Sequence, residues 1–248
     1  MNYQLIITCE HASNKIPAQF RFLFINQSQL LQSHCSWDIG AFTTYKKLVK
    51  KFPCQSLHGK WSRLLIDLNR SLHHSNLYSQ FSRNLTIVKK NLLVNNYYLA
   101  YHNTIKSWLT KACHKKIFTI HLSIHSFTPQ LNKQVRLNDI GFLYDPKRAI
   151  EKQFCANWKA AMKNIAPTLN IRMNYPYRGN SDGLTSALRK SFNQDQYIGI
   201  ELEINQKHFN SNGLSKSLLL EFIATSLQAT LLKFPNNRIK NVNLIKKR

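Results

Sequence analysis

Acidic residues are scarce in this chain of 248 residues, which has 11 Asp and Glu against 35 Lys and Arg. The formal charge of +24 would attract anionic partners such as small acids, nucleic acid or a membrane surface. A compositional bias towards Lys and Asn explains this charge equally well. The scarcity makes each carboxylate informative, because eight of the eleven lie in or beside the motifs described below: Glu10, Asp38, Asp67, Asp139, Asp145, Asp182, Glu201 and Glu203.

Two further absences narrow the class of protein. The five cysteines are widely spaced and form no CxxC pair, so neither a zinc ribbon nor a disulfide framework is predicted, and a reducing cytoplasm fits best. The sequence has no apolar run of about 18 residues or more, so no membrane-spanning helix is expected. The first residues, MNYQLIITCEHAS, lack the charged region and cleavage site of a signal peptide and predict an early strand.

Strand-like and helix-like segments alternate along the chain. This alternation predicts one α/β domain over residues 1–248, with a three-layer α/β/α architecture and a basic tail at about 236–248. We expect a helix from Ser36 to near Lys51, because Ser is a good N-cap and Asp38 would lie in the first turn. The other expected helices are 97–113, 147–165, 184–192 and 214–233; the strands are 4–9, 54–57, 64–68, 117–124, 140–144, 169–173 and 197–204; residues 71–95 are expected to form a loop.

Polar residues follow or end several of these strands. His125 and Ser126 follow the near-continuously apolar strand 117–124, and Glu10-His11 follows the first strand. In open α/β sheets, ligands bind in the crevice beyond the carboxyl ends of the strands. Imidazoles and carboxylates delivered to such an edge indicate a hydrolytic metal site.

His11 and His125 are the candidate imidazole ligands of this site. Two imidazoles and one carboxylate, with a water in the fourth position, make a catalytic zinc site. Asp38 and Glu10 both qualify as the carboxylate. Adjacent residues in an extended segment point to opposite faces, so Glu10 and His11 would not both aim at the metal without a kink. Asp38 is therefore favoured over Glu10.

Glu203 near the end of strand 197–204 is the candidate general base, and Glu201 on the same face is the alternative. A carboxylate beside a metal-bound water can take its proton, since the metal lowers the pKa of that water to about 7. Arg70 could clamp a carboxylate or stabilise an oxyanion, and Asp67 is expected to orient a neighbour. The further candidates for binding an acidic substrate are Arg63, Asn69, Ser126, Arg136, Arg178 and Arg189.

Taken together, these segments resemble the N-formylglutamate amidohydrolase family. The matching stretches run in order over roughly residues 5–210: CEHASNKIP, SHCSWDIGA, SRLLIDLNR, IHSFTP, DIGFLYD, NYPYRGN and GIELEINQ. His-Ser after a strand, Asp-Leu-Asn-Arg and the late strand Glu also resemble zinc carboxypeptidases and acylases. Two positions depart from these patterns: Asn14 stands where the carboxypeptidase pattern has Glu, and Asn205 stands where an Arg often follows the late Glu.

The resemblance implies a phosphorylase/hydrolase-like fold with a mixed central sheet. It also implies a hydrolase with one zinc ion per chain that cleaves the amide of a small N-formyl or N-acyl amino acid. His11, Asp38 and His125 would hold the metal, Glu203 would act as base, and arginines such as Arg70 would bind the substrate carboxylate.

Two alternatives stay open. A non-catalytic basic protein on a hydrolase scaffold could bind nucleic acid or an anionic surface, and this binding would be steeply salt-dependent. It is less favoured because the Lys and Arg residues are scattered and no nucleic-acid-binding motif is present. The second alternative is an amidohydrolase for another acyl or peptide-like substrate, including cell-wall fragments, which the site residues do not exclude.

Overall fold

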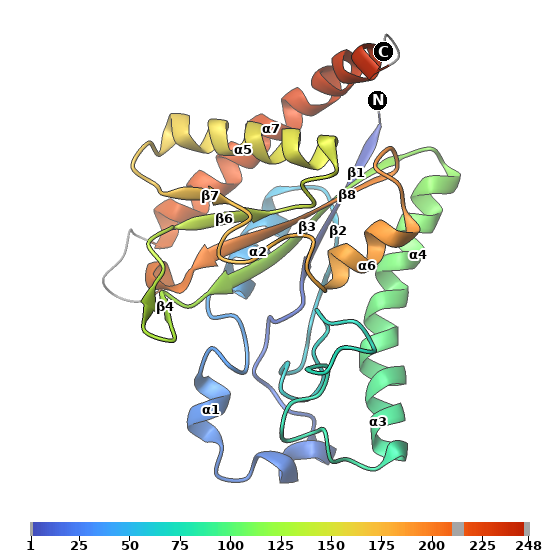
Figure 1. Cartoon of the computed structure of the whole chain (residues 1–248), viewed down its shortest axis with the longest axis vertical. Helices are drawn as coiled ribbons and strands as arrows, with labels where there is room; N and C mark the ends of the chain where they lie inside the picture. Colours follow the sequence, from blue (N-terminus) through green and yellow to red (C-terminus); the bar gives the residue numbers. More distant parts are fainter. Residues whose placement is uncertain (1, 210–215, 246–248) are drawn as a thin grey trace.

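A six-stranded mixed sheet forms the centre of the molecule in the computed structural model, which describes residues 2–209 and 216–245 (Figure 1). Its strand order is β2-β1-β3-β8-β6-β7, and β6 runs antiparallel to β8 while the other neighbouring pairs are parallel. The strands are β1 (Tyr3–Cys9), β2 (Gln55–His58), β3 (Phe118–Phe127), β6 (Ile140–Leu143), β7 (Ile171–Met173) and β8 (Tyr197–Asn205); β4 (Gln130–Leu131) and β5 (Gln134–Val135) form a separate hairpin.

Helices cover both faces of the sheet, so the three-layer α/β/α prediction is confirmed (Figure 1). One core cluster joins the sheet to α2 (Ala41–Lys51), α5 (Ala149–Ile165) and α7 (Lys216–Ile245). The other joins it to α4 (Ala100–His114) and α6 (Leu184–Ser191). The remaining helical segments are η1 (Ala18–Phe24), α1 (Ser28–Gln32), α3 (Ile87–Leu93), the π-helical η2 (Val94–Leu99) and η3 (Gln206–Phe209).

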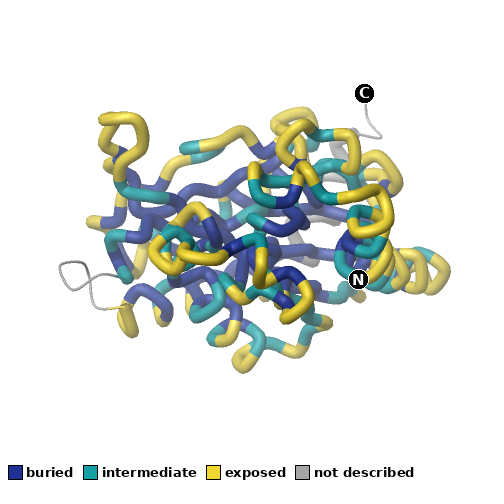
Figure 2. Tube along the Cα trace, turned by 90° about the horizontal axis from the view of Figure 1, so that it is seen from below, coloured by how far each residue is buried: buried dark blue, intermediate teal, exposed yellow. Residues whose placement is uncertain are grey.

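The central strands are buried on both faces because helices pack against both. Leu5 and Ile7 of β1 lie in the first core cluster, whereas Ile6 between them lies in the second. All ten residues of β3 are buried, as its apolar sequence predicts. In Figure 2 the strands run as dark blue tube through the middle of the molecule. Each buried Leu, Ile or Phe contributes about 1.5–3 kcal/mol through the hydrophobic effect, so this double-sided core holds the strand ends in fixed positions.

Three local expectations were wrong. Residues 64–68 form turns rather than a strand, because their backbone bonds locally, with Leu65 N donating to Ser62 O. Residues 71–86 form the expected loop, but α3 begins at Ile87 within the range assigned to it. The Ser36 helix begins only after Gly40, whose φ of +88° ends the preceding turn, and Ser36 Oγ bonds Ser62 rather than a helix N–H.

Helix α7 has the length and hydropathy of a membrane span over Lys216–Phe234, but half of its most apolar window is buried within the protein. Leu219, Ile223 and Leu227 are fully buried in the first core cluster. We therefore interpret this segment as a core helix. The basic tail expected at about 236–248 continues the α7 backbone as far as Ile245, and the expected helix start at 214–215 lies outside the described residues.

Candidate metal centre and active site

His11, Asp38 and His125 converge at the carboxyl edge of the sheet. One ligand atom from each residue lies within 4.8 Å of the others, and all three residues are buried. His11 follows β1, His125 lies near the end of the parallel β3, and Asp38 is tied to the first of them by its backbone N–H, which donates to His11 O at 3.0 Å. Sheet topology and one backbone bond therefore bring together residues that are far apart in the sequence.

The same ring nitrogen of both histidines faces Asp38. His125 Nδ1 lies 2.9 Å and His11 Nδ1 lies 3.4 Å from Asp38 Oδ2. Ligands of a tetrahedral zinc ion with bonds of about 2.0–2.1 Å are about 3.3 Å apart, so two Nδ1 atoms and a carboxylate oxygen at these separations fit one such ion. Asp38 rather than Glu10 faces both of these nitrogens.

The opposite nitrogen of each histidine meets a second carboxylate. His11 Nε2 donates to Asp67 Oδ1 at 2.7 Å, and His125 Nε2 lies 3.0 Å from Glu10 Oε2. Carboxylates in this position fix the ring orientation and the tautomer of a metal-binding histidine. Asp67 was expected to orient a neighbour, and the structure places it against His11. Glu10, the alternative ligand, instead contacts the far side of His125.

Hydrogen bonds anchor both of these supporting carboxylates. Arg63 donates to Asp67 Oδ2 from Nη2 at 2.6 Å and from Nε at 3.1 Å. Although burial opposes ionisation, Arg63 and His11 hold the pKa of Asp67 well below its usual range. Glu10 accepts bonds from Ser123 Oγ and from Tyr101 Oη, the latter at 3.0 Å. Both carboxylates are therefore held ionised against the histidines.

The charges of this cluster favour a bound cation. Burial alone would lower the pKa of His125, but its hydrogen bonds to Asp38 and Glu10 raise that pKa well above its usual value. In the metal-free state the site therefore stabilises positive charge on an imidazole. A divalent ion on the two Nδ1 atoms and Asp38 would take the place of that charge, so the residues fit zinc.

Glu203 faces this cluster from the neighbouring strand, where it is the register partner of His125. Its side chain is buried, and among the described residues Glu203 Oε2 has no hydrogen-bond partner. Burial, together with the negative charges of Asp38 and Glu201, raises the pKa of Glu203 to about 8. Glu201 also reaches the cavity, but its Oε1 accepts a hydrogen bond from Thr185 Oγ1 at 2.6 Å. Glu203 is thus the carboxyl group with a free oxygen beside the ligands.

A cavity of about 330 Å³ opens onto these groups. The three candidate ligands, Glu203 and Glu201 all line it, and so do the predicted substrate-binding residues Arg63, Asn69, Arg70, Ser126 and Arg178. Several of these side chains also have structural partners. Arg70 Nη1 donates to Asp182 O at 3.2 Å, Asn69 Oδ1 accepts from Leu184 N at 2.7 Å, and Ser126 Oγ donates to Ile39 O at 2.7 Å.

Two of the sequence candidates stand apart from the cavity lining. Arg136 donates to Tyr177 Oη at 3.1 Å and lies over the Tyr177 ring, whose residue does line the cavity. Arg189 is held by Glu151, with Nε and Oε1 3.0 Å apart. Asn205, at the position where an Arg was expected, donates to Arg136 O and Asn138 O and is buried.

Gln206, Tyr177 and Leu131 line the cavity and were missed from the sequence. Gln206 directly follows the last strand. The search for polar residues after strands, which identified His11, would therefore also have identified Gln206. Tyr177 lies in the loop after β7 and Leu131 in the β4–β5 hairpin, and their positions depend on loop geometry that has no periodic signal.

A family comparison fits this site. The profile of the N-formylglutamate amidohydrolase family matches residues 3–209. The chain belongs to this family. The match spans all five carboxylates described around the site, both histidines and every predicted substrate-binding residue. The predicted family resemblance is confirmed.

Solved structures share the fold of this family member. A gene product of Agrobacterium tumefaciens is 24% identical with a TM-score of 0.79, over 94% of this chain and 92% of that one. N-formylglutamate amidohydrolase from Ralstonia eutropha is 14% identical with a TM-score of 0.67, over 94% of each chain. Comparison with curated proteins gave no match. At these identities the structural likeness shows the fold, and the family membership supports hydrolase activity.

Proposed function

We propose that the protein is a zinc-dependent amidohydrolase that releases a free amino acid and a carboxylate, such as formate, from a small N-acyl amino acid. The observation that carries this proposal is the convergence of His11 Nδ1, His125 Nδ1 and Asp38 beside Glu203, a buried carboxyl group whose Oε2 has no partner among the described residues. Amide hydrolysis needs an activated water and a proton donor for the leaving amine. This arrangement can provide both.

His11, Asp38 and His125 would hold the zinc ion, which when bound would lower the pKa of a coordinated water and polarise the substrate carbonyl. Glu203 would receive a proton at its free Oε2 and then donate it to the leaving nitrogen. A raised pKa suits the second of these transfers, since a general acid must be protonated near neutral pH. For the first transfer Glu203 must be ionised, and positive charge at His11, Asp38 and His125 would favour its carboxylate form.

The rim of the cavity supports an anionic substrate. Arg63, Arg70 and Arg178 all line the cavity. Arg63 forms ion pairs with Asp67 and Asp38, and its Nη1 lies 3.3 Å from His11 Nδ1. Guanidinium groups bind carboxylates through paired hydrogen bonds, and the positions of Arg70 and Arg178 in the cavity lining suit this role. A cavity of about 330 Å³ favours a compact acyl amino acid over a longer peptide. The free cysteines of the described chain fit a cytoplasmic location.

Release of formate from N-formylglutamate tests this proposal, with N-formylleucine and N-acetylglutamate as comparison substrates. We expect turnover that chelation abolishes and zinc restores. Glu203→Gln should retain metal and lose at least about 100-fold in kcat, the lower end of the contribution of a general acid or base. Turnover that persists after complete metal removal, or in Glu203→Gln, would contradict the assigned roles.

Arg178→Gln separates substrate recognition from chemistry. If Arg178 binds the substrate carboxylate, the variant should raise KM for N-formylglutamate and leave zinc content unchanged. Lys152→Gln, at an exposed position of α5, removes the same charge outside the cavity and serves as the control. Equal kinetic effects of the two variants would exclude a direct contact between Arg178 and the substrate.

A further inference from the structure

One end of the molecule lacks acidic side chains altogether. Residues 11–37 and 68–93, here called the extended lobe, form the lower part of the molecule in Figure 1 and contain no Asp or Glu. They contain six cationic residues: Lys15, Arg21, Arg70, Arg83, Lys89 and Lys90. The only acids between residues 1 and 138 are Glu10, Asp38 and Asp67, which are all buried in the site described above. The extended lobe itself thus contributes no negative side chain to its surface; Asp182, from outside the lobe, accepts a hydrogen bond from Ser71 N beside Arg70.

Five large apolar side chains are exposed on this lobe, and all except Leu72, which is 40% exposed, lie in or beside η1 and α3. Phe22 is 50% exposed, Ile25 67%, Ile87 69% and Val88 73%. Phe22 lies in η1 and Ile25 directly follows it, whereas Ile87 and Val88 begin α3. We call these four residues the apolar tip. Their exposure contrasts with Phe20 and Phe24 in the same η1 segment, which are buried in the core.

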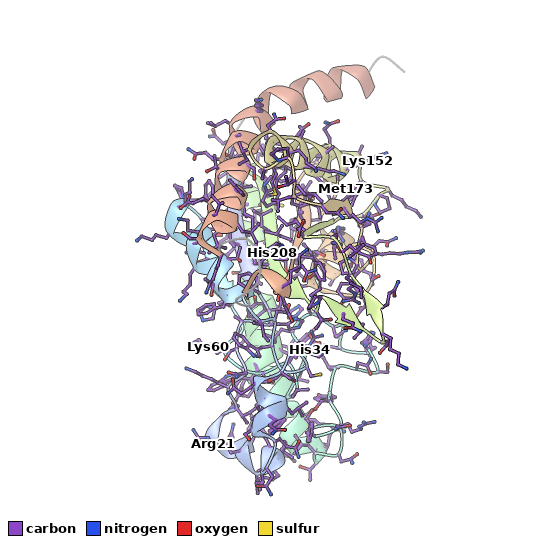
Figure 3. The ribbon with its side chains drawn as sticks, turned by 90° about the vertical axis from the view of Figure 1, so that its left-hand side faces the viewer. Arg21, His34, Lys60, Lys152, Met173 and His208 are labelled. Atoms are coloured by element: carbon purple, nitrogen blue, oxygen red, sulfur yellow. The ribbon has the colours of Figure 1, made fainter. Side chains whose placement is uncertain are left out.

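Contacts between η1 and α3 bring the two halves of the apolar tip together. Lys89 Nζ lies 4.5 Å from the centre of the Phe22 ring, which places the start of α3 against η1. Phe24 and Phe81 pack behind this contact, with ring centres 5.1 Å apart. Figure 3, in which Arg21 is labelled at the bottom, places η1 at the end of the molecule opposite the C-terminal part of α7. The tip thus projects from one end of the longest axis.

We propose that the apolar tip and the cations around it dock the protein on an anionic phospholipid surface. Apolar side chains inserted at the headgroup boundary, flanked by Lys and Arg, form the pattern of peripheral membrane binding. Arg21 and Lys89 are exposed beside the four apolar residues and would contact lipid phosphates. This surface is separate from the hydrolytic site, and the inference does not depend on the proposed reaction.

Charge and shape favour lipid over other partners. A second copy of the chain would bring two acid-free cationic lobes together, and like charges would repel. Nucleic acid would engage the cations and would have the Phe22 ring for stacking, but it gains nothing from the three exposed aliphatic side chains Ile25, Ile87 and Val88. A lipid interface accommodates both, because acyl chains accept the apolar residues and headgroup phosphates accept the cations.

Co-sedimentation with vesicles tests the proposal. The full chain should bind vesicles of phosphatidylcholine with added phosphatidylglycerol, should not bind phosphatidylcholine alone, and should bind less as salt rises. Phe22→Ser/Val88→Ser removes two tip residues without changing charge and should reduce binding at least about tenfold, since each loses buried apolar area. Leu232→Ser, which alters a 73% exposed residue of α7, is the matched control and should bind normally.

A second pair of variants separates local charge from net charge. Arg21→Gln/Lys89→Gln should weaken binding roughly 30-fold, from about fivefold per cation near an anionic surface. Lys111→Gln/Lys115→Gln removes the same charge at the far end of the helix that begins with α3, about 40 Å away at 1.5 Å per residue, and should change binding less than about twofold. Thermal unfolding of each variant checks that the fold is retained.

Three results would overturn the proposal. The first is no binding to anionic vesicles by the wild-type chain. The second is an equal loss of binding in Arg21→Gln/Lys89→Gln and in Lys111→Gln/Lys115→Gln, which would show that net charge alone is responsible. The third is tighter binding to double-stranded DNA than to vesicles. If Arg21→Gln/Lys89→Gln weakened the DNA binding and Phe22→Ser/Val88→Ser left the DNA binding unchanged, nucleic acid would be identified as the partner.

Discussion

The pKa of Glu203 predicts a specific pH dependence of stability in the metal-free protein. Burial raises this pKa from 4.5 to about 8. A carboxyl group whose pKa is higher in the folded than in the unfolded state stabilises the fold fully below the unfolded value, and this contribution is lost as pH rises towards the folded value. The affected window therefore runs from about pH 4.5 to about pH 8. Glu203→Gln, which is neutral at every pH, removes this dependence.

The expected magnitude follows from the linkage relation. Between pH 5 and pH 7.5, a group with these two pKa values loses about 3 kcal/mol of stability, and partial hydration of the site reduces this to about 2–3 kcal/mol. Urea unfolding of chelated wild-type protein and chelated Glu203→Gln at both pH values measures the change in their difference. From pH 5 to pH 7.5, the free energy of unfolding of the variant should rise by about 2–3 kcal/mol relative to that of the wild type. A change below about 0.5 kcal/mol would refute the assignment of a buried, unpartnered carboxyl group.

Three further predictions concern the groups around the site and the core. Asp67→Ala should lower zinc affinity about 10–100-fold, because His11 loses its carboxylate partner. Competition with a chromophoric chelator measures this affinity, and an unchanged value would exclude the supporting role of Asp67. Glu151→Gln should lower the free energy of unfolding by about 3–5 kcal/mol in urea without altering zinc content, since the Arg189 side chain, which is 6% exposed, loses its carboxylate partner. Trp158→Ala should cost a similar amount, about 3–5 kcal/mol, by opening a cavity between α5 and the sheet, and its zinc content should also be normal.

The elements that the sequence predicts well are those whose hydrophobic pattern the sheet itself requires. Strands β1, β3 and β8 have long apolar runs because helices cover both of their faces, and they end in the polar residues that form the site. Their parallel arrangement then brings His11, His125 and Glu203 to one edge. The positions of these three residues therefore follow from the hydrophobic pattern of the strands together with the parallel topology of the sheet.

The remainder depends on irregular backbone. Residues 64–68 have the apolar run of a strand, yet local turns bury them and place Asp67 against His11. The sequence also suggested that Glu10 and His11 diverge. Glu10 contacts His125 Nε2, whereas His11 contacts Asp38 and Asp67, so both residues contribute to one network. No periodic pattern in the sequence predicts either arrangement, because each depends on a few long-range hydrogen bonds.

The central claim is that His11, Asp38 and His125 form one zinc site. Elemental analysis of protein purified without chelator measures it most directly, with His125→Ala and the surface variant His114→Ala as a matched pair. We expect about one zinc per chain in the wild type and in His114→Ala, and almost none in His125→Ala, since loss of one of three protein ligands disrupts the site. Wild-type protein that contains no metal and takes up none on reconstitution, or zinc that persists in His125→Ala, would contradict the account.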